Sequence, residues 1–194
     1  MRFHGLLSVF MMIFVPMMVA AQTQTGHGMA TQKHLTMTIT AFPDGSDIPL
    51  KYTAAGSQTS PEITWINTPP GTVTFLLHMH DMDVSRNHTT DDQLHWIVWN
   101  IPGTATSLPE GVPSGAQLQN GAYQVSASGP SYRGPGAPAS FPKHHYAFEL
   151  FALDTKIDVQ PGTDPFETRA NIMKAIQGHI LEKASYVGLF HRPQ

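Results

Sequence analysis

The chain has 194 residues, of which 13% are charged, and its formal net charge is −3. This low and slightly acidic charge provides neither a basic surface for nucleic acid nor a basic amphipathic segment for a membrane surface, so we expect neither partner. Cysteine is absent, which excludes disulfides and a lipid anchor on a cysteine. The 11 histidines are the compositional anomaly.

The first 21 residues predict a secretory signal peptide. Arg2 and His4 precede an apolar run from Leu6 to Ala21, and small residues close this run where a signal peptidase reads the chain. The run is short for a membrane-spanning helix and no basic stop-transfer cluster follows it. We therefore expect cleavage near Ala21, no transmembrane segment in the mature protein, and a periplasmic or secreted location. Residues 22–33 are expected to form a flexible spacer.

Residues 34–194 predict a single, mainly β domain. Short segments rich in β-branched and aromatic residues alternate with turns that contain Pro, Gly, Asn and Asp, a spacing typical of antiparallel sheets. The expected strands are residues 34–41, 62–66, 73–81, 94–101, 145–153 and 186–190. The Gly- and Pro-rich stretch between Pro102 and Lys143 is long for a connection in a compact domain, so we expect it to be either disordered or functional.

One helix is predicted near the C-terminus. Asp164 is placed to cap its N-terminus, Pro165 suits the first helical position, and Glu167 completes a capping-box pattern. Gly178 is expected to kink or end the helix. Isoleucines recur at four-residue spacing and predict a buried stripe, formed by Ile172, Ile176 and Ile180.

The run LLHMHDMDV, residues 76–84, places two histidines and two aspartates at the end of an apolar strand. Because successive side chains of a strand point to opposite faces, Asp81 and Asp83 continue the core-facing row, whereas His78 and His80 face the other way. The aspartates therefore lie where the mouth of a pocket is expected to open.

Two further strands carry polar side chains at their ends. His144 and Tyr146 begin an apolar row on one strand, and His95 is expected to share a face with Ile97 and Trp99 on another. Three strands with this pattern predict the lining of one concave site.

Four segments of the chain form an ordered set of motifs: SPEITWINTPPGT (60–72), DMD (81–83) with LHWIVWNIPG (94–103), YRGPGAPASFPKHHYAFELFALD (132–154) and MKAIQGHILEKASYVGLFHR (173–192). In this order they resemble motifs of the phosphatidylethanolamine-binding protein family, which includes the Raf kinase inhibitor proteins, and most closely its bacterial branch. The resemblance implies a central antiparallel sheet packed on a second, smaller sheet, with short helices including one near the C-terminus. It also implies a surface pocket that binds anionic groups such as the phosphate of phosphatidylethanolamine.

Carried over by motif, the ligand-binding residues implied by the resemblance are Asp81, Asp83, His95, Gly136, Pro138, His144 and Tyr146. Met82, Val84 and Ser85 depart from the prolines and alanine of the family pattern, so the pocket is expected to persist while its ligand preference stays open.

The expected chemistry places a carboxylate behind an imidazole. Asp81 or Asp83 would accept a hydrogen bond that holds the tautomer and raises the pKa of His95 or His144, so that the second ring nitrogen donates to an anion. The hydroxyl group of Tyr146 and backbone N–H groups of the Gly-rich loop would supply the other donors.

The expected function is that of an exported small-ligand binding protein that takes an anionic small molecule or a phospholipid headgroup. A protein partner, such as an enzyme that it inhibits, is left open. No catalytic residue, metal or cofactor is expected, because the sequence contains neither a nucleophile motif nor a complete metal motif.

The alternative is a hydrolase. A metal enzyme would use His78 and His80 on one strand face, completed by His88 or an aspartate. A metal-free hydrolase would use acid and base groups from the other face of the sheet, namely Asp81, Asp83 and His95.

Overall fold

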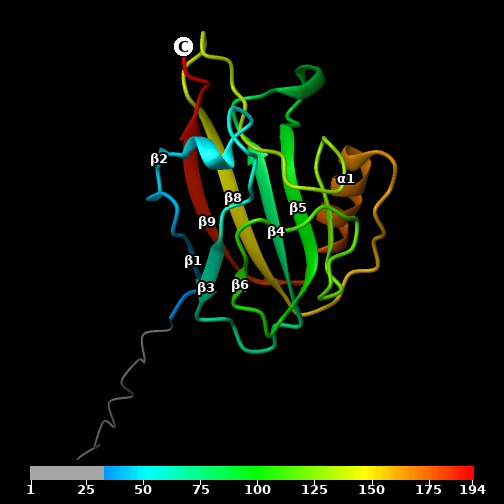
Figure 1. Cartoon of the computed structure of the whole chain (residues 1–194). Coiled ribbons are helices and arrows are strands. Elements are labelled where there is room, and N and C mark those ends of the chain that lie inside the picture. The colour runs from blue at the N-terminus through cyan, green and yellow to red at the C-terminus, as the bar shows by residue number, and fades with distance from the viewer. Residues whose placement is uncertain (1–32) are drawn as a thin grey trace, which may run out of the picture. The chain divides into compact units, whose positions relative to one another are not determined.

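The structure is a computed structural model that describes residues 33–194 (Figure 1). The predicted signal peptide and nearly all of the predicted spacer lie outside the described residues. The described part of the chain forms two β-sheets and one α-helix, so the mainly β class is confirmed. Within this part, no helix is long and apolar enough to cross a membrane.

The larger sheet has six strands in the order β2, β9, β8, β4, β5, β7, and the smaller sheet has the order β1, β3, β6. All pairings are antiparallel except the short parallel contact of β2 with β9. The strands are β1 (Thr36–Ile39), β2 (Ser46–Asp47), β3 (Ile63–Ile66), β4 (Thr74–Asp81), β5 (Gln93–Pro102), β6 (Ser107–Leu108), β7 (Tyr123–Val125), β8 (His144–Leu153) and β9 (Ile180–Phe190). Two 3-10 helices, Leu50–Tyr52 and Arg86–His88, lie in the connections.

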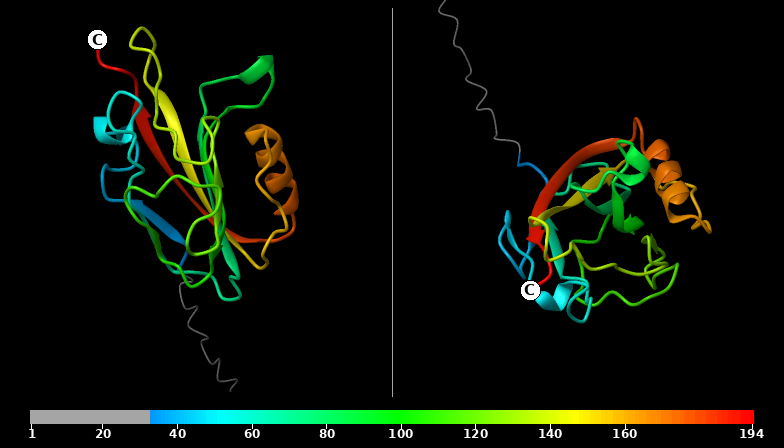
Figure 2. Two further views of the ribbon diagram at one scale, coloured as in Figure 1. Left: turned by 45° about the vertical axis from the view of Figure 1, so that its right-hand side comes forward. Right: turned by 90° about the horizontal axis from the view of Figure 1, so that it is seen from above.

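The larger sheet is covered on both faces. Its alternating side chains enter two separate apolar clusters, one shared with the smaller sheet and one shared with helix α1 (Pro165–Ala175). Figure 2 shows the smaller sheet and α1 on opposite sides of the larger sheet. Along β4, Phe75, Leu77 and Met79 join the first cluster and Leu76 joins the second. The strand-face prediction for this strand is therefore confirmed.

Helix α1 begins as the sequence predicts. The side chain of Asp164 accepts hydrogen bonds from the backbone N–H groups of Phe166 (2.8 Å) and Glu167 (3.3 Å). The helix ends at Ala175, and Gly178 follows with a φ of +82°, a conformation that favours glycine.

The predicted isoleucine stripe is correct for Ile172 and Ile176, which are buried, and wrong for Ile180. Ile180 is 44% exposed because the chain has already left the helix there and begun β9. Strand β9 is accordingly much longer than the predicted strand over residues 186–190.

A β-bulge in β5 changes the predicted orientation of His95. Met79 of β4 pairs with Trp96, but the next residue, His80, pairs with Leu94, so His95 is the extra residue of β5. Strict alternation would place His95 with Ile97 and Trp99 in the cluster beside α1. The bulge instead turns its side chain to the opposite face, so this prediction is wrong.

The long connection between Pro102 and Lys143 is ordered around one buried side chain, that of Gln124. Its amide nitrogen donates to the backbone oxygens of Pro113 (2.7 Å) and Gly115 (2.9 Å), and its amide oxygen accepts from Trp96 Nε1 (2.9 Å). This network fixes the connection against β5, which excludes the disordered alternative.

Candidate functional site

A pocket of about 220 Å³ opens at the end of the larger sheet where β4 ends and β8 begins. Six of the seven residues assigned from the resemblance line it: Asp81, His95, Gly136, Pro138, His144 and Tyr146. They come from three neighbouring strands and from the Gly-rich loop before β8.

Asp81 and His144 form a hydrogen-bonded pair in the lining of this pocket. Asp81 is only 3% exposed, and its carboxylate accepts a hydrogen bond from His144 Nδ1, at 2.9 Å from Oδ2 and 3.1 Å from Oδ1. The bond fixes the orientation of the imidazole and leaves Nε2 for a ligand. The expected placement of a carboxylate behind an imidazole is thus present in this pair.

Asp83, the seventh assigned residue, does not line the pocket. Its Oδ2 accepts hydrogen bonds from the backbone N–H (2.5 Å) and from Nδ1 (3.0 Å) of His145. Met82 N–H donates to the His145 carbonyl oxygen at 3.0 Å, a bond that proline at this position cannot make. The departure from the family pattern therefore ties the turn after β4 to the start of β8.

His95 is an uncharged group rather than the expected imidazolium. Its Nδ1 lies 2.9 Å from the carbonyl oxygen of Arg133, which can only accept, so Nδ1 carries the proton and Nε2 a lone pair. Burial lowers the pKa of His95 to about 4, although the Arg133 carbonyl oxygen and the charge of Asp81 act in the opposite direction. At neutral pH Nε2 of His95 is therefore a hydrogen-bond acceptor.

Tyr146 organises the Gly-rich loop. Its hydroxyl oxygen accepts from the N–H groups of Gly136 (3.2 Å) and Ala137 (3.1 Å), and its ring meets the ring of His95 edge-on with centroids 5.0 Å apart. These two N–H groups are therefore committed to Tyr146, which contradicts the expectation that they serve a ligand. The proton of the hydroxyl group is not used in either bond.

Two arginines complete the lining and were not identified from the sequence. Arg133 and Arg192 bring two guanidinium groups to a pocket whose only lining carboxylate is that of Asp81. The backbone N–H of Arg192 donates to the Ala137 carbonyl oxygen at 2.9 Å, which anchors the C-terminal segment at the pocket. Both arginines lie in loops, where strand-face reasoning does not apply, yet both fall within the quoted motif segments.

His78 and His80 lie on the opposite face of β4, as predicted, and do not reach this pocket. The side chain that completes their cluster is Glu149 of β8, rather than His88 or an aspartate. Burial alone would lower the pKa of His80, but the hydrogen bond to Asp92 and the nearby carboxylate of Glu149 raise it to about 9.

Comparison with known proteins identifies the family to which the chain is similar. The family model described as phosphatidylethanolamine-binding protein matches residues 38–191. A UPF0098 protein of Methanothermobacter thermautotrophicus is 36% identical over 154 residues, which is 78% of this chain and 95% of that relative.

Two solved structures share the fold. A phosphatidylethanolamine-binding protein homologue from Chlamydia trachomatis has a TM-score of 0.68 at 28% identity, with 82% of this chain and 99% of that chain covered. Escherichia coli YbcL, described as a member of the mammalian family, has a TM-score of 0.70 at 23% identity, with 83% and 100% covered. The chain belongs to the phosphatidylethanolamine-binding protein family.

Proposed function

We propose that the chain is an exported binding protein whose pocket holds a small phosphate-bearing ligand, such as a phospholipid headgroup. Its family consists of ligand-binding proteins that are generally non-catalytic, which supports binding as the activity. The signal peptide predicted from residues 1–21 supports export.

The observation that carries the proposal is the pair of arginines in the lining. Guanidinium groups bind phosphate oxygens through paired, charge-assisted hydrogen bonds, and they stay charged at every physiological pH. With two guanidinium groups against one carboxylate, and with that carboxylate bonded to His144, the pocket favours an anion.

Each remaining polar group has a role in the proposed complex. His144 Nε2 is available to the ligand as a hydrogen-bonding group, since Nδ1 is bonded to Asp81. The hydroxyl group of Tyr146, which also hydrogen-bonds with Asp81, holds the Gly-rich loop at the pocket. His95 Nε2 accepts a hydrogen bond from a protonated phosphate oxygen. The pocket therefore suits the singly protonated phosphate of a monoester such as phosphorylethanolamine, because the diester phosphate of an intact phospholipid carries no such proton.

The geometry favours binding over metal-free hydrolysis. A general base works best when its pKa lies near the operating pH, and His95 with a pKa of about 4 is a weak base at neutral pH. The carboxylate of Asp81 is bonded to His144 and that of Asp83 to His145, so both carboxylates are engaged within the protein.

Titration of the untagged protein with phosphorylethanolamine, followed by two-dimensional NMR, tests the proposal. We expect saturable shifts at His95, Gly136, His144 and Tyr146, with a dissociation constant between roughly millimolar and micromolar. Arg192→Gln should weaken binding about tenfold or more, because it removes one charge-assisted contact.

The matched control is Arg86→Gln, which makes the same charge change in the turn beside α1, where Arg86 stacks on the ring of Phe166. It should bind like the wild type. Parallel titrations with inorganic phosphate and with ethanolamine separate recognition of the phosphate from recognition of the headgroup amine. The absence of shifts with both phosphorylethanolamine and inorganic phosphate would overturn the proposed ligand class.

A further inference from the structure

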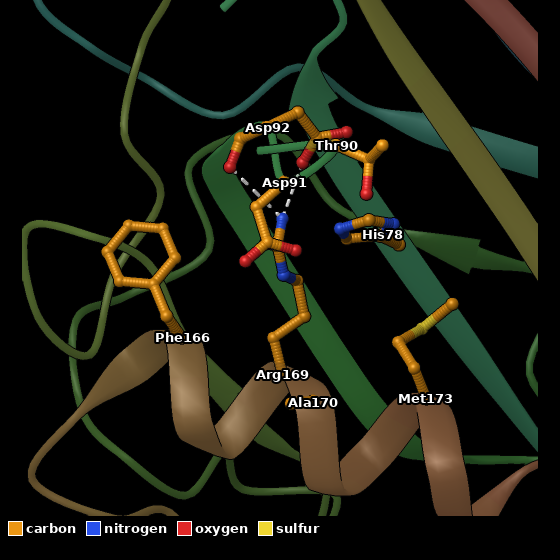
Figure 3. Close-up of a pocket in the computed structure, with 8 residues that line it drawn as sticks. All are labelled: His78, Thr90, Asp91, Asp92, Phe166, Arg169, Ala170 and Met173. Atoms are coloured by element: carbon orange, nitrogen blue, oxygen red, sulfur yellow. Dashed lines mark hydrogen bonds and ion pairs between the residues drawn. The ribbon is translucent and has the colours of Figure 1, made fainter. Parts of the chain in front are cut away.

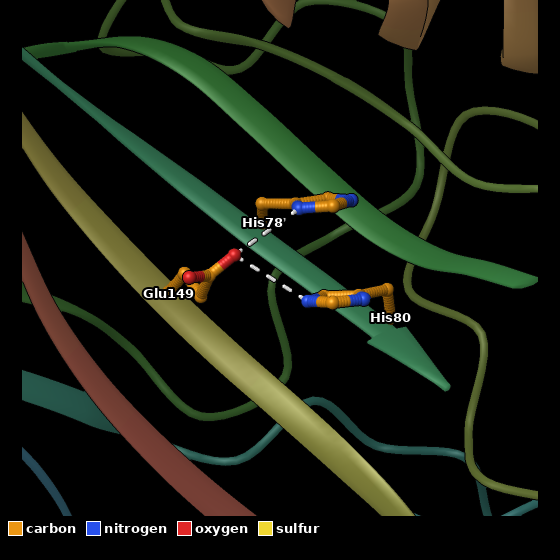
Figure 4. Close-up of side chains that lie close together, drawn as sticks. All are labelled: His78, His80 and Glu149. Atoms are coloured by element: carbon orange, nitrogen blue, oxygen red, sulfur yellow. Dashed lines mark ion pairs between the residues drawn. The ribbon is translucent and has the colours of Figure 1, made fainter. Parts of the chain in front are cut away.

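A second cluster of titratable side chains lies on the α1 side of the larger sheet and is separate from the proposed ligand pocket. His78 and His80 project from this face of β4, and Glu149 lies directly opposite His78 on the neighbouring strand β8. Figure 4 shows the two imidazoles stacked, with the Glu149 carboxylate at their edge. The ring planes differ by 3° and their centroids are 4.4 Å apart.

Three of the four ring nitrogens of this cluster lack hydrogen-bond partners in the described part of the chain, and only His80 Nδ1 has one, the carboxylate of Asp92. His78 is 5% exposed, and neither of its ring nitrogens has a hydrogen-bond partner among residues 33–194. His80 Nε2 is also buried and without a properly directed hydrogen bond, although Glu149 Oε2 lies 3.4 Å away. Buried polar atoms in native proteins are rarely left unsatisfied, so these nitrogens indicate a missing occupant.

The surroundings hold these groups in the manner of metal ligands. His80 Nδ1 donates to the carboxylate of Asp92, and Arg169 Nη1 holds the other oxygen of that carboxylate at 2.5 Å. A carboxylate behind a histidine is the arrangement that orients metal-binding imidazoles, because it fixes the tautomer and leaves Nε2 for the ion. Lys183 Nζ similarly holds Glu149 Oε1 at 3.3 Å and leaves Oε2 beside the histidines.

We propose that His78, His80 and Glu149 bind one divalent transition-metal ion of the zinc type. Two imidazoles and one carboxylate form a three-residue set that zinc accepts with a fourth position open. In a tetrahedral site with bonds near 2.1 Å, the donor atoms lie roughly 3.4 Å apart. Glu149 Oε2 is 3.4 Å from His80 Nε2 and 3.8 Å from His78 Nδ1, close to that spacing.

Binding requires two small adjustments. The parallel rings must tilt toward a common point, which the broad torsion of a histidine ring about its Cβ–Cγ bond permits. The ion also displaces the proton of His80 Nε2, which is released to solvent.

A cavity provides access for the ion. It has a volume of about 260 Å³, and Figure 3 shows His78 pointing into it from β4 between Asp92 and Met173. Arg169 and Asp91, which also line this cavity, are paired at 3.8 Å. Once the ion has displaced the proton of His80, the carboxylates of Asp91, Asp92 and Glu149 outnumber the cations of Arg169 and Lys183 by one, so the surroundings stabilise the bound ion.

The test is a titration of the untagged protein with Zn²⁺, measured by competition with a chromophoric chelator, together with Co²⁺ as a spectroscopic probe. We expect one equivalent of Zn²⁺ to bind and Co²⁺ to give the intense visible absorption of a four-coordinate site. Glu149→Gln keeps the shape of the side chain and should weaken Zn²⁺ binding at least tenfold. Asp92→Asn, behind the site, should weaken it by about 10- to 100-fold.

The matched control is His179→Gln, because His179 is also paired with a carboxylate, that of Asp154 at 2.8 Å, but lies outside the cluster. It should bind Zn²⁺ like the wild type. Long-range nitrogen-detected NMR of the wild-type imidazoles gives a readout that needs no variant, with Zn²⁺ shifting the ring nitrogens of His78 and His80. Absence of stoichiometric binding, or binding that leaves these nitrogens unshifted and is insensitive to Glu149→Gln, would overturn the proposal.

Discussion

At the scale of single residues, the chemistry of the ligand pocket depends on the uncharged state of His95. The second pKa of a phosphate group is about 6, so a phosphate monoester is mostly a dianion at pH 8. A dianion presents a lone pair to the lone pair of His95 Nε2, and one proton must sit between them in the complex. Above pH 6 the complex therefore holds one more proton than the separate protein and ligand.

This proton uptake sets the direction of the pH dependence. Affinity for phosphorylethanolamine should fall by up to about tenfold per pH unit above pH 6, hence by up to about 100-fold at pH 8. NMR or calorimetric titrations at the two pH values measure the ratio. In His95→Gln, whose amide can donate without taking up a proton, the ratio should shrink toward one, and an unchanged ratio in that variant would contradict the role of His95.

The sequence pattern predicted some of the residues of the pocket correctly. The alternation of side chains grouped Asp81 with the start of β8, and the structure brings Asp81 and His144 into a hydrogen bond. It could not separate Asp81 from Asp83, because the turn after β4 directs the Asp83 carboxylate to the His145 backbone. It also missed Glu149, although the same alternation assigns Glu149 to the face away from His144.

At the scale of elements, the capping of helix α1 gives a prediction about stability. Asp164→Ala removes the acceptor of two backbone N–H groups, those of Phe166 and Glu167, at the first turn. We expect the free energy of unfolding to fall by about 1 kcal/mol, within a range of roughly 0.5–2 kcal/mol. Urea denaturation followed by circular dichroism measures this loss.

Asp158→Ala is the control for that measurement. Asp158 is an exposed aspartate before the helix, so its replacement should change the free energy of unfolding by no more than about 0.5 kcal/mol. Equal losses in the two variants would show that a general change in charge, rather than the cap, accounts for the effect.

Sequence patterns predicted the start of this helix better than its end. The cap at Asp164 is a local signal, because the residues that form it are close in the sequence and contact one another. The secondary structure of Ile180 depends on a residue distant in the sequence. Ile180 pairs with Leu153 of β8, so it belongs to strand β9 and not to the helix. The bulge at His95 likewise depends on how β4 and β5 pair with each other. The pattern of residues along β5 alone carries no information about that pairing.

At the scale of the whole molecule, the larger sheet separates two sites that are adjacent in the sequence. Within LLHMHDMDV, His80 and Asp81 are neighbours, yet they serve opposite faces of β4. Each face is covered by its own apolar cluster, and the polar groups lie where those clusters end. The two-sheet architecture was predictable only through the resemblance, since residue patterns alone indicate antiparallel strands without their spatial order.

The signal peptide predicted from residues 1–21 gives a prediction about the location of the protein in the cell. When the full chain is expressed in a Gram-negative bacterium, we expect the protein recovered from the periplasm to begin at Gln22, because the apolar run from Leu6 ends in small residues at Ala21. Intact-mass measurement of that fraction tests this, and Ala21→Trp, which puts a bulky residue at the cleavage position, should leave the leader attached. Recovery of the full-length wild-type chain from the cytoplasm would contradict export, which is part of the proposed function.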